Sequence, residues 1–215
     1  MNYAFDKYAK RYDLWYDKPF GKTAFKLETD CIKTLCKDLR RPFLEVGVGT
    51  GRFAFALDIK YGVDRSIGVL KLAKEREIEC VRGMGEALPF ISNSFGAVFL
   101  IVTLCFVEDP KGVLEEVERV LIDKGHLILG LIFKGSPWAI FYSRKAEAGN
   151  VFYKMARFYT FGEVKSLLDE TNFQIEDVAS TIFQAPTEEP LLSEEPKLGY
   201  NKEAGFVAIK AKKKG

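Results

Sequence analysis

Apolar and polar positions follow two alternating periods over the first two thirds of the chain. Short stretches rich in apolar residues predict strands at 43–46, 59–63, 78–82, 97–102 and 127–133, and 97–102 is the continuous apolar run typical of a central parallel strand. Between these runs, apolar residues recur three or four positions apart at 24–39, 66–76 and 110–121, which is the spacing of an amphipathic helix. Regular alternation of strand and helix predicts a parallel sheet covered by helices.

The pattern changes after residue 133. The segment 135–159 is rich in aromatic residues and breaks the strand–helix alternation. Thr160 and Glu163 have the spacing of a capping box, which predicts that a helix starts there. Strands are expected at 173–182 and 205–211, and an exposed acidic loop is expected at 186–196. With only a loop between them, the last two strands should pair antiparallel.

The N-terminal segment 4–18 places Phe5, Tyr8 and Tyr12 on one face of a helix. Two interpretations stay open: the aromatic rings pack on the core, or they form a lid over a ligand. Pro19 and Gly21 are expected to interrupt the chain before the next helix.

Composition narrows the class of protein. The chain has 215 residues, of which 47% are hydrophobic and 29% charged, and this fits one soluble α/β domain. A net charge of +2 gives no basic surface for nucleic acid. No apolar run is long enough to span a membrane, and the first residues do not form a secretory signal.

Cysteine and histidine usage limits the chemistry. The four cysteines have no metal-ligand spacing and fit a reduced, cytoplasmic protein. His126, the only histidine, rules out a multi-histidine metal site and is expected to face solvent. We therefore predict no metal.

The segment 42–53, PFLEVGVGTGRF, joins a strand to a helix through three glycines, Gly47, Gly49 and Gly51. Such a turn allows a polar ligand to approach the backbone at a helix start. A dinucleotide-binding turn has its third glycine where Arg52 stands. A tight turn without a ligand is the alternative.

Asp64 ends the second predicted strand, 17 positions after Gly47. A carboxylate at the carboxyl end of this strand can accept hydrogen bonds from both hydroxyls of a ribose, and it would repel a phosphate there. The alternative is that Asp64 caps the helix that follows.

LEVGVGTGRF resembles the first motif of class I S-adenosylmethionine-dependent methyltransferases. The stretches 83–95 and 103–110 resemble the later motifs of this family, especially in small-molecule enzymes such as the ubiquinone and menaquinone methyltransferases. There are departures. Met84 stands where the family has an acid that binds the adenine amino group, and Gly85 replaces an alanine. Cys105 and Phe106 replace two histidines.

The resemblance implies a Rossmann-like, doubly wound, seven-stranded and mostly parallel sheet of order 3-2-1-4-5-7-6. Strand 7 is antiparallel, and an N-terminal helical lid is added. It implies one domain over 1–215, with a helical cap at 1–40 and a second cap segment at 134–159. For the cofactor S-adenosyl-L-methionine, whose product is S-adenosyl-L-homocysteine, it implies contacts from Tyr12, Glu45, Gly47, Gly49, Gly51, Asp64, Arg65, Met84, Gly85, Glu86 and Ile101. The expected substrate contacts are Tyr8, Cys105, Phe106, Trp138 and Tyr142.

The expected function is methyl transfer to a nitrogen or sulfur atom of a small molecule. No catalytic acid–base pair stands out, and the chemistry requires none, because alignment of the acceptor and exclusion of water suffice. The alternatives are a non-catalytic cofactor-binding regulator and a nicotinamide-dependent oxidoreductase. We expect no nucleic-acid partner, no membrane association, and a monomer or homodimer.

Overall fold

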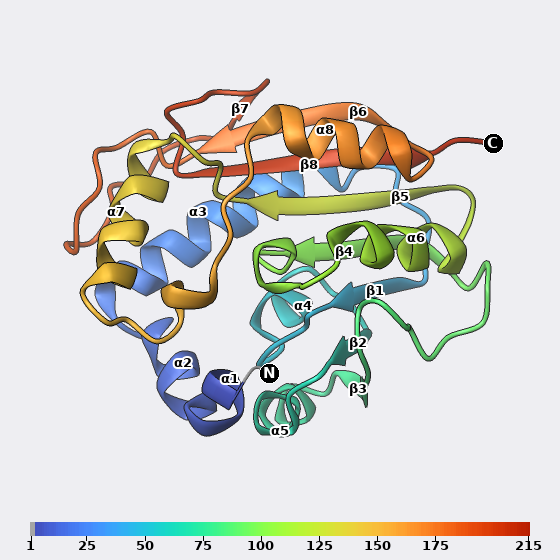
Figure 1. Cartoon of the computed structure of the whole chain (residues 1–215), viewed down its shortest axis with the longest axis horizontal. Helices are drawn as coiled ribbons and strands as arrows, with labels where there is room; N and C mark the ends of the chain where they lie inside the picture. The colour runs from blue at the N-terminus through green and yellow to red at the C-terminus, as the bar shows by residue number, and fades with distance from the viewer. Residues whose placement is uncertain (1–2) are drawn as a thin grey trace.

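The computed structural model describes residues 3–215, and its centre is one eight-stranded sheet of order β3-β2-β1-β4-β5-β8-β6-β7 (Figure 1). The strands are β1 (Phe43–Val46), β2 (Tyr61–Asp64), β3 (Glu79–Arg82), β4 (Phe95–Ile101), β5 (Leu121–Leu131), β6 (Phe173–Thr181), β7 (Lys197–Leu198) and β8 (Phe206–Lys213). The five strands β1 to β5 pair parallel, whereas β8 pairs antiparallel with both β5 and β6.

The predicted order is confirmed, with β8 in the place of strand 7. The strand count differs by one, because the two-residue strand β7 adds to the edge of β6. Nothing in the apolar pattern marks it, since both of its residues are exposed. Backbone pairing alone defines β7, and such pairing leaves no periodic signal in side chains.

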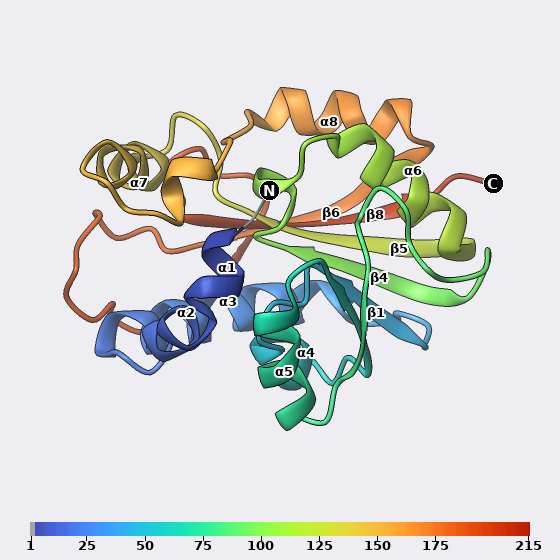
Figure 2. The same cartoon turned by 60° about the horizontal axis from the view of Figure 1, so that its bottom comes forward.

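Helices cover both faces of the sheet (Figure 2). On one side lie α3 (Pro19–Leu35), α4 (Arg52–Ala56) and α5 (Ile67–Glu75), and on the other α6 (Pro110–Val120) and α8 (Phe161–Glu170). Four further elements lie near the ends at which the parallel strands finish: α1 (Tyr3–Lys7), α2 (Ala9–Trp15), α7 (Pro137–Glu147) and the short helix η2 (Tyr153–Met155). One more, η1 (Leu104–Phe106), directly follows β4.

Local sequence signals explain several helix starts. Asp109 caps α6 and Pro110 is its first residue, while Thr160 and Glu163 form the predicted capping box of α8. The expectation that Pro19 and Gly21 interrupt the chain is wrong. Pro19 occupies the first turn of α3, where a missing N–H costs nothing, and Gly21 lies within that helix. A side chain at Gly21 would collide with the carbonyl of Trp15, at 2.1 Å.

The core forms two apolar layers, one on each face of the sheet, and all seven residues of β4 are buried between them. Two expectations about exposure fail. His126 does not face solvent: its side chain is 12% exposed and its Nε2 lies 3.1 Å from Glu176. The loop 186–196 is not fully exposed either, because Leu191 is buried and its N–H donates to Thr23.

Within residues 3–215, no helix has both the length and the apolar character needed to cross a membrane.

Candidate functional site

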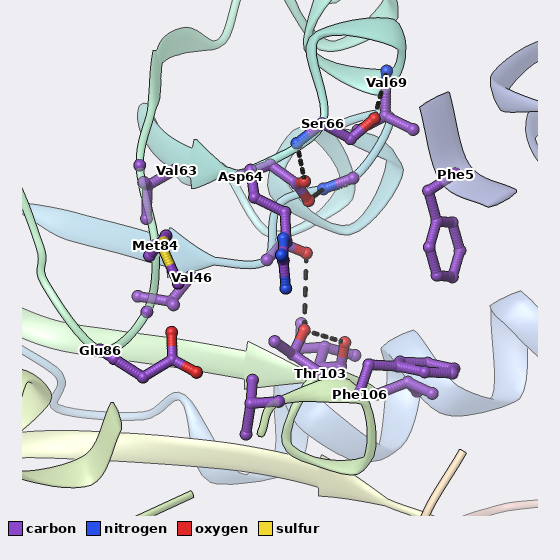
Figure 3. A pocket seen from close by; sticks show the side chains of 18 of the residues that line it. Phe5, Val46, Val63, Asp64, Ser66, Val69, Met84, Glu86, Thr103 and Phe106 are labelled. Atoms are coloured by element: carbon purple, nitrogen blue, oxygen red, sulfur yellow. Dashed lines mark hydrogen bonds between the residues drawn. The ribbon is translucent and has the colours of Figure 1, made fainter. Parts of the chain in front are cut away.

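A pocket lies at the carboxyl ends of β1, β2 and β4. Figure 1 shows α1 and α2 on the same side of the sheet. Its lining combines backbone turns with apolar and aromatic side chains (Figure 3). The lining residues are Phe5, Tyr12, Val46, Gly47, Gly49, Val63, Asp64, Arg65, Ser66, Val69, Gly83, Met84, Gly85, Glu86, Ile101, Val102, Thr103, Phe106 and Val107. The parallel strands of an α/β sheet commonly bind ligands at this edge.

The glycine turn has little space for side chains. Gly47 has φ +75°, and a Cβ there would lie 2.4 Å from the Thr103 side chain. Gly51 has φ +81° and precedes α4; a Cβ there would lie 3.0 Å from Ala73. Gly47 therefore keeps the backbone open to the pocket beside β4, whereas Gly51 serves the close packing of α4 against α5.

The Asp64 carboxylate is held by backbone donors at the pocket wall. Its Oδ2 accepts from the N–H of Gly49 at 3.0 Å, and its Oδ1 accepts from the N–H of Ser66 at 2.8 Å. Burial is the main cause of its raised pKa. Each oxygen has capacity for one more hydrogen bond, so the carboxylate fits a pair of neighbouring hydroxyls.

The cap of helix α5 is Ser66 and not Asp64. Ser66 is the N-cap of α5, and its hydroxyl accepts from the N–H of Val69. Asp64 stays available to a ligand while it supports the glycine turn through Gly49.

Met84, Gly85 and Glu86 form another part of the wall. In Figure 3, Met84 and Glu86 lie toward one end of the pocket, and Phe5 and Phe106 lie toward the other. The Met84 side chain is 49% exposed, and a Cβ on Gly85 would lie 3.0 Å from Val113. About half of Met84 is therefore open, and its apolar thioether can pack against a ligand in the pocket.

Aromatic rings close the opposite end. Phe5 of α1 contacts Phe106 at 5.4 Å and Phe152 at 5.3 Å between ring centroids, and Tyr12 of α2 contacts Phe152 at 5.6 Å. Asp6 ties α1 to the start of α5, since it accepts from the Ser66 hydroxyl and from the N–H of Gly68. These contacts place the N-terminal helices over the pocket.

Asp13 fastens α2 to the glycine turn. Its carboxylate accepts from Arg52 at 2.8 and 3.0 Å and from Arg76 at 2.9 Å. Burial opposes ionisation of Asp13, but hydrogen bonds from Arg52, Thr50 and Arg76 outweigh it and lower the pKa to about 2. Arg52, which occupies the position of the third glycine in dinucleotide-binding turns, thus holds the lid.

Ten of the predicted site residues lie in this lining: Tyr12, Gly47, Gly49, Asp64, Arg65, Met84, Gly85, Glu86, Ile101 and Phe106. Six lie outside it: Tyr8, Glu45, Gly51, Cys105, Trp138 and Tyr142. Sequence reasoning did not select Ser66 or Thr103. Each lies two positions after the last residue of a strand, Asp64 or Ile101, and that position could have identified them.

The residues outside the lining have other contacts. Glu45 is buried beneath the turn, and burial raises its pKa well above the usual range. Trp138 is 1% exposed and donates from Nε1 to the carbonyl of Gln184. Cys105 is buried, and burial raises its pKa to about 12, so it is a poor nucleophile. Their roles as ligand contacts remain predictions.

The described part of the chain contains no group of three or more His, Cys, Asp or Glu residues arranged to hold a metal ion.

The chain is similar to known methyltransferases in sequence and in structure. The pattern of the methyltransferase domain family matches residues 44–129. A Thermotoga maritima structure, described as an S-adenosylmethionine-dependent methyltransferase and possible histamine N-methyltransferase, is similar over 100% of both chains, with 34% identity and a TM-score of 0.89.

Two sequence relatives add a match over most of the chain and a local match. An uncharacterised protein of Mycobacterium tuberculosis is 40% identical over 203 residues, which cover 94% of this chain and 71% of that protein. A demethylmenaquinone methyltransferase of Renibacterium salmoninarum is 40% identical over 93 residues, which cover 40% of this chain and 39% of that enzyme.

Proposed function

Because the chain belongs to the class I S-adenosylmethionine-dependent methyltransferases, we propose that it methylates a small molecule at a nitrogen or sulfur atom. The family makes it an enzyme with S-adenosylmethionine as its cofactor. This decides against a nicotinamide-dependent oxidoreductase and a non-catalytic regulator. The identity of the acceptor is the proposed part.

The pocket residues fit the cofactor. Asp64 retains acceptor capacity for two ribose hydroxyls, and the open turn at Gly47 leaves room beside Thr103. Met84 and Glu86 would bound the adenine, and Tyr12 would lie over the methionine part. The bound cofactor supplies an electrophilic methyl group whose leaving thioether is neutral. The chain has only to orient the acceptor and to exclude water.

The main support for a small acceptor is that the rings of Phe5, Phe106 and Phe152 close one end of the pocket. A site covered by rings from three separate segments of the chain suits a compact apolar molecule better than a polymer. The net charge of +2 agrees, since a nucleic-acid substrate calls for a basic surface. The Thermotoga maritima neighbour, described as a possible histamine N-methyltransferase, supports nitrogen as one candidate atom.

The proposal also covers the two cap segments, the oligomeric state and the cellular location. Residues 1–40 and 134–159 would act as the two cap segments of a single domain. The enzyme would work in the cytoplasm as a monomer or homodimer, on a small-molecule substrate.

We expect S-adenosylmethionine and S-adenosylhomocysteine to bind, and NAD not to bind. Asp64 suits a ribose, and Arg52 stands where a dinucleotide-binding turn needs its third glycine. Isothermal titration with each ligand is the direct measurement. Heat of binding with NAD and none with S-adenosylhomocysteine would contradict the expectation.

We also expect Met84→Asp to tighten cofactor binding by up to about 1 kcal/mol, because a carboxylate there can accept from the adenine amino group. Met84 is half exposed in the pocket wall, so an aspartate can be accommodated without loss of core packing. Titration of S-adenosylhomocysteine against Met84→Asp and Met84→Leu separates the new hydrogen bond from a change of shape. Weaker binding by Met84→Asp alone would show that the thioether packs on the adenine ring.

A further inference from the structure

Glu28 occupies a position in α3 where an apolar residue is expected. Ala24 precedes it by four residues and Ile32 follows it by four, so all three lie on one face of the helix. Ala24 and Ile32 are both buried in the core. Cys31 and Leu35, on the same face, are buried as well. A carboxylate therefore lies in the middle of the apolar stripe of α3.

Burial makes ionisation of the Glu28 side chain unfavourable. Desolvation alone raises the pKa of Glu28 to about 8. The side chain is still only partly buried, so solvent reaches it. Within residues 3–215 it has neither a hydrogen-bond partner nor a cation. An acid that is kept without a partner in such surroundings is typical of a binding or catalytic site.

Four tyrosines from other segments belong to the apolar layer that contains Ala24 and Ile32 and lie near Glu28. Tyr12 of α2 and Tyr16, which caps the end of that helix, share a hydrogen bond of 2.9 Å between their hydroxyls. Tyr142 of α7 stacks on Tyr153 of η2 with 4.5 Å between ring centroids. Burial is the main cause of the raised pKa of each of these four hydroxyls and of the Cys31 thiol, and the nearby Glu28 adds to it. The cluster thus consists of one acid, one thiol and four phenols.

The cluster adjoins the cofactor pocket through Tyr12. Its ring lines the pocket, and its hydroxyl bonds to Tyr16 on the side of the cluster. Tyr12 also contacts Phe152, which belongs to the aromatic closure. The tyrosine cluster around Glu28 is therefore placed to receive a molecule that reacts in the adjoining pocket.

We infer that Glu28 and the tyrosines at positions 12, 16, 142 and 153 bind the ammonium group of the methyl acceptor, which is therefore a small amine with an apolar body. This rests on the proposed function and narrows it from nitrogen or sulfur to nitrogen. An ammonium supplies the donors and the positive charge that favour the ionised form of Glu28, and phenol rings attract a cation. A thiolate or a carboxylate acceptor would be repelled by Glu28.

Glu28 also provides a route for the proton. The acceptor enters as an ammonium and must lose one proton before its lone pair can attack. The Glu28 carboxylate takes this proton and becomes a carboxylic acid, which solvent later deprotonates. The nitrogen lone pair then forms the bond to the methyl carbon. The carbon–sulfur bond breaks, and its electron pair stays on the sulfur.

The test measures binding by titration with S-adenosylhomocysteine present at saturation. The probes are phenethylamine and its neutral counterpart 2-phenylethanol. The proteins are the wild type, Glu28→Gln, Glu28→Asp and the control Glu115→Gln, whose side chain is exposed on α6. We expect Glu28→Gln to weaken phenethylamine binding by about 10- to 100-fold, as for loss of a charged hydrogen-bond partner, and to leave 2-phenylethanol unchanged. Glu28→Asp should retain part of the affinity.

The possible outcomes test the binding of an amine by Glu28 and the proposed methyltransferase function separately. Equal phenethylamine affinity in the wild type and Glu28→Gln, with S-adenosylhomocysteine still bound, would overturn the inference and leave the proposed function standing. So would a wild type that binds the alcohol but not the amine. A wild type that binds no S-adenosylhomocysteine would instead defeat the proposed function. Glutamine preserves the volume of the side chain, and the melting temperature of each variant verifies the fold.

Discussion

Replacing Asp64 with alanine should weaken the binding of S-adenosylhomocysteine by about 2–4 kcal/mol, or roughly 30- to 1,000-fold. Asp64 lines the pocket, and the acceptor capacity left on its two oxygens would be used by the two ribose hydroxyls. Hydrogen bonds to an ionised group are stronger than neutral ones, and two are lost together. Isothermal titration of the folded variant measures the change.

The same substitution removes the hydrogen bonds that Asp64 accepts from Gly49 and Ser66, so structural damage must be separated from lost binding. Asp64→Asn keeps one oxygen and the side-chain volume, and it should fall between the wild type and Asp64→Ala. Asp58→Ala, at an exposed site, serves as the matched control. A folded Asp64→Ala variant with unchanged affinity would leave Asp64 with only its role in the glycine turn.

Replacing Asp13 with alanine should lower the free energy of unfolding by about 2–3 kcal/mol at pH 7, because Arg52 and Arg76 lose a partly buried partner. The folded pKa of Asp13, about 2, lies below the usual 3.8. The wild type therefore has this stability at pH values above 3.8 and loses it as the pH falls toward 2. Urea unfolding at pH 7 and pH 3 measures both parts.

Asp17→Ala is the control for Asp13. Asp17 also accepts from Arg52, at 2.9 Å, but its side chain is 57% exposed, whereas that of Asp13 is 14% exposed. Exposed ion pairs contribute about 0–1 kcal/mol, so Asp17→Ala should change little. Equal losses in the two variants would mean that burial of Asp13 adds nothing to its ion pairs. The lid should also loosen in Asp13→Ala, which cofactor affinity can report.

The sequence predicted the central part of the molecule well. The order of the sheet followed from strand–helix alternation together with the family resemblance, and the spacing between Gly47 and Asp64 anticipated two residues that both line the pocket. These features depend on neighbours close in sequence or on the regular geometry of parallel strands. Such information is local, and it is therefore visible in a single chain.

What the sequence did not predict depends on contacts between distant segments. The partners of Asp13 lie 39 and 63 positions away, and no spacing rule connects them. The burial of His126 and the packing of Leu191 likewise depend on β6 and α3. Glu28 is different, because its place on the face of Ala24 and Ile32 is readable from helical spacing.

Glu28 has a consequence for any effort to improve this protein. A carboxylate in an apolar stripe lowers stability at neutral pH, so random mutagenesis screened only for heat resistance will favour its replacement. Under our inference, variants enriched by such a screen would still bind the cofactor but would no longer bind the amine acceptor. A directed-evolution campaign on this scaffold should therefore select for catalytic turnover in every round and treat Glu28 as fixed.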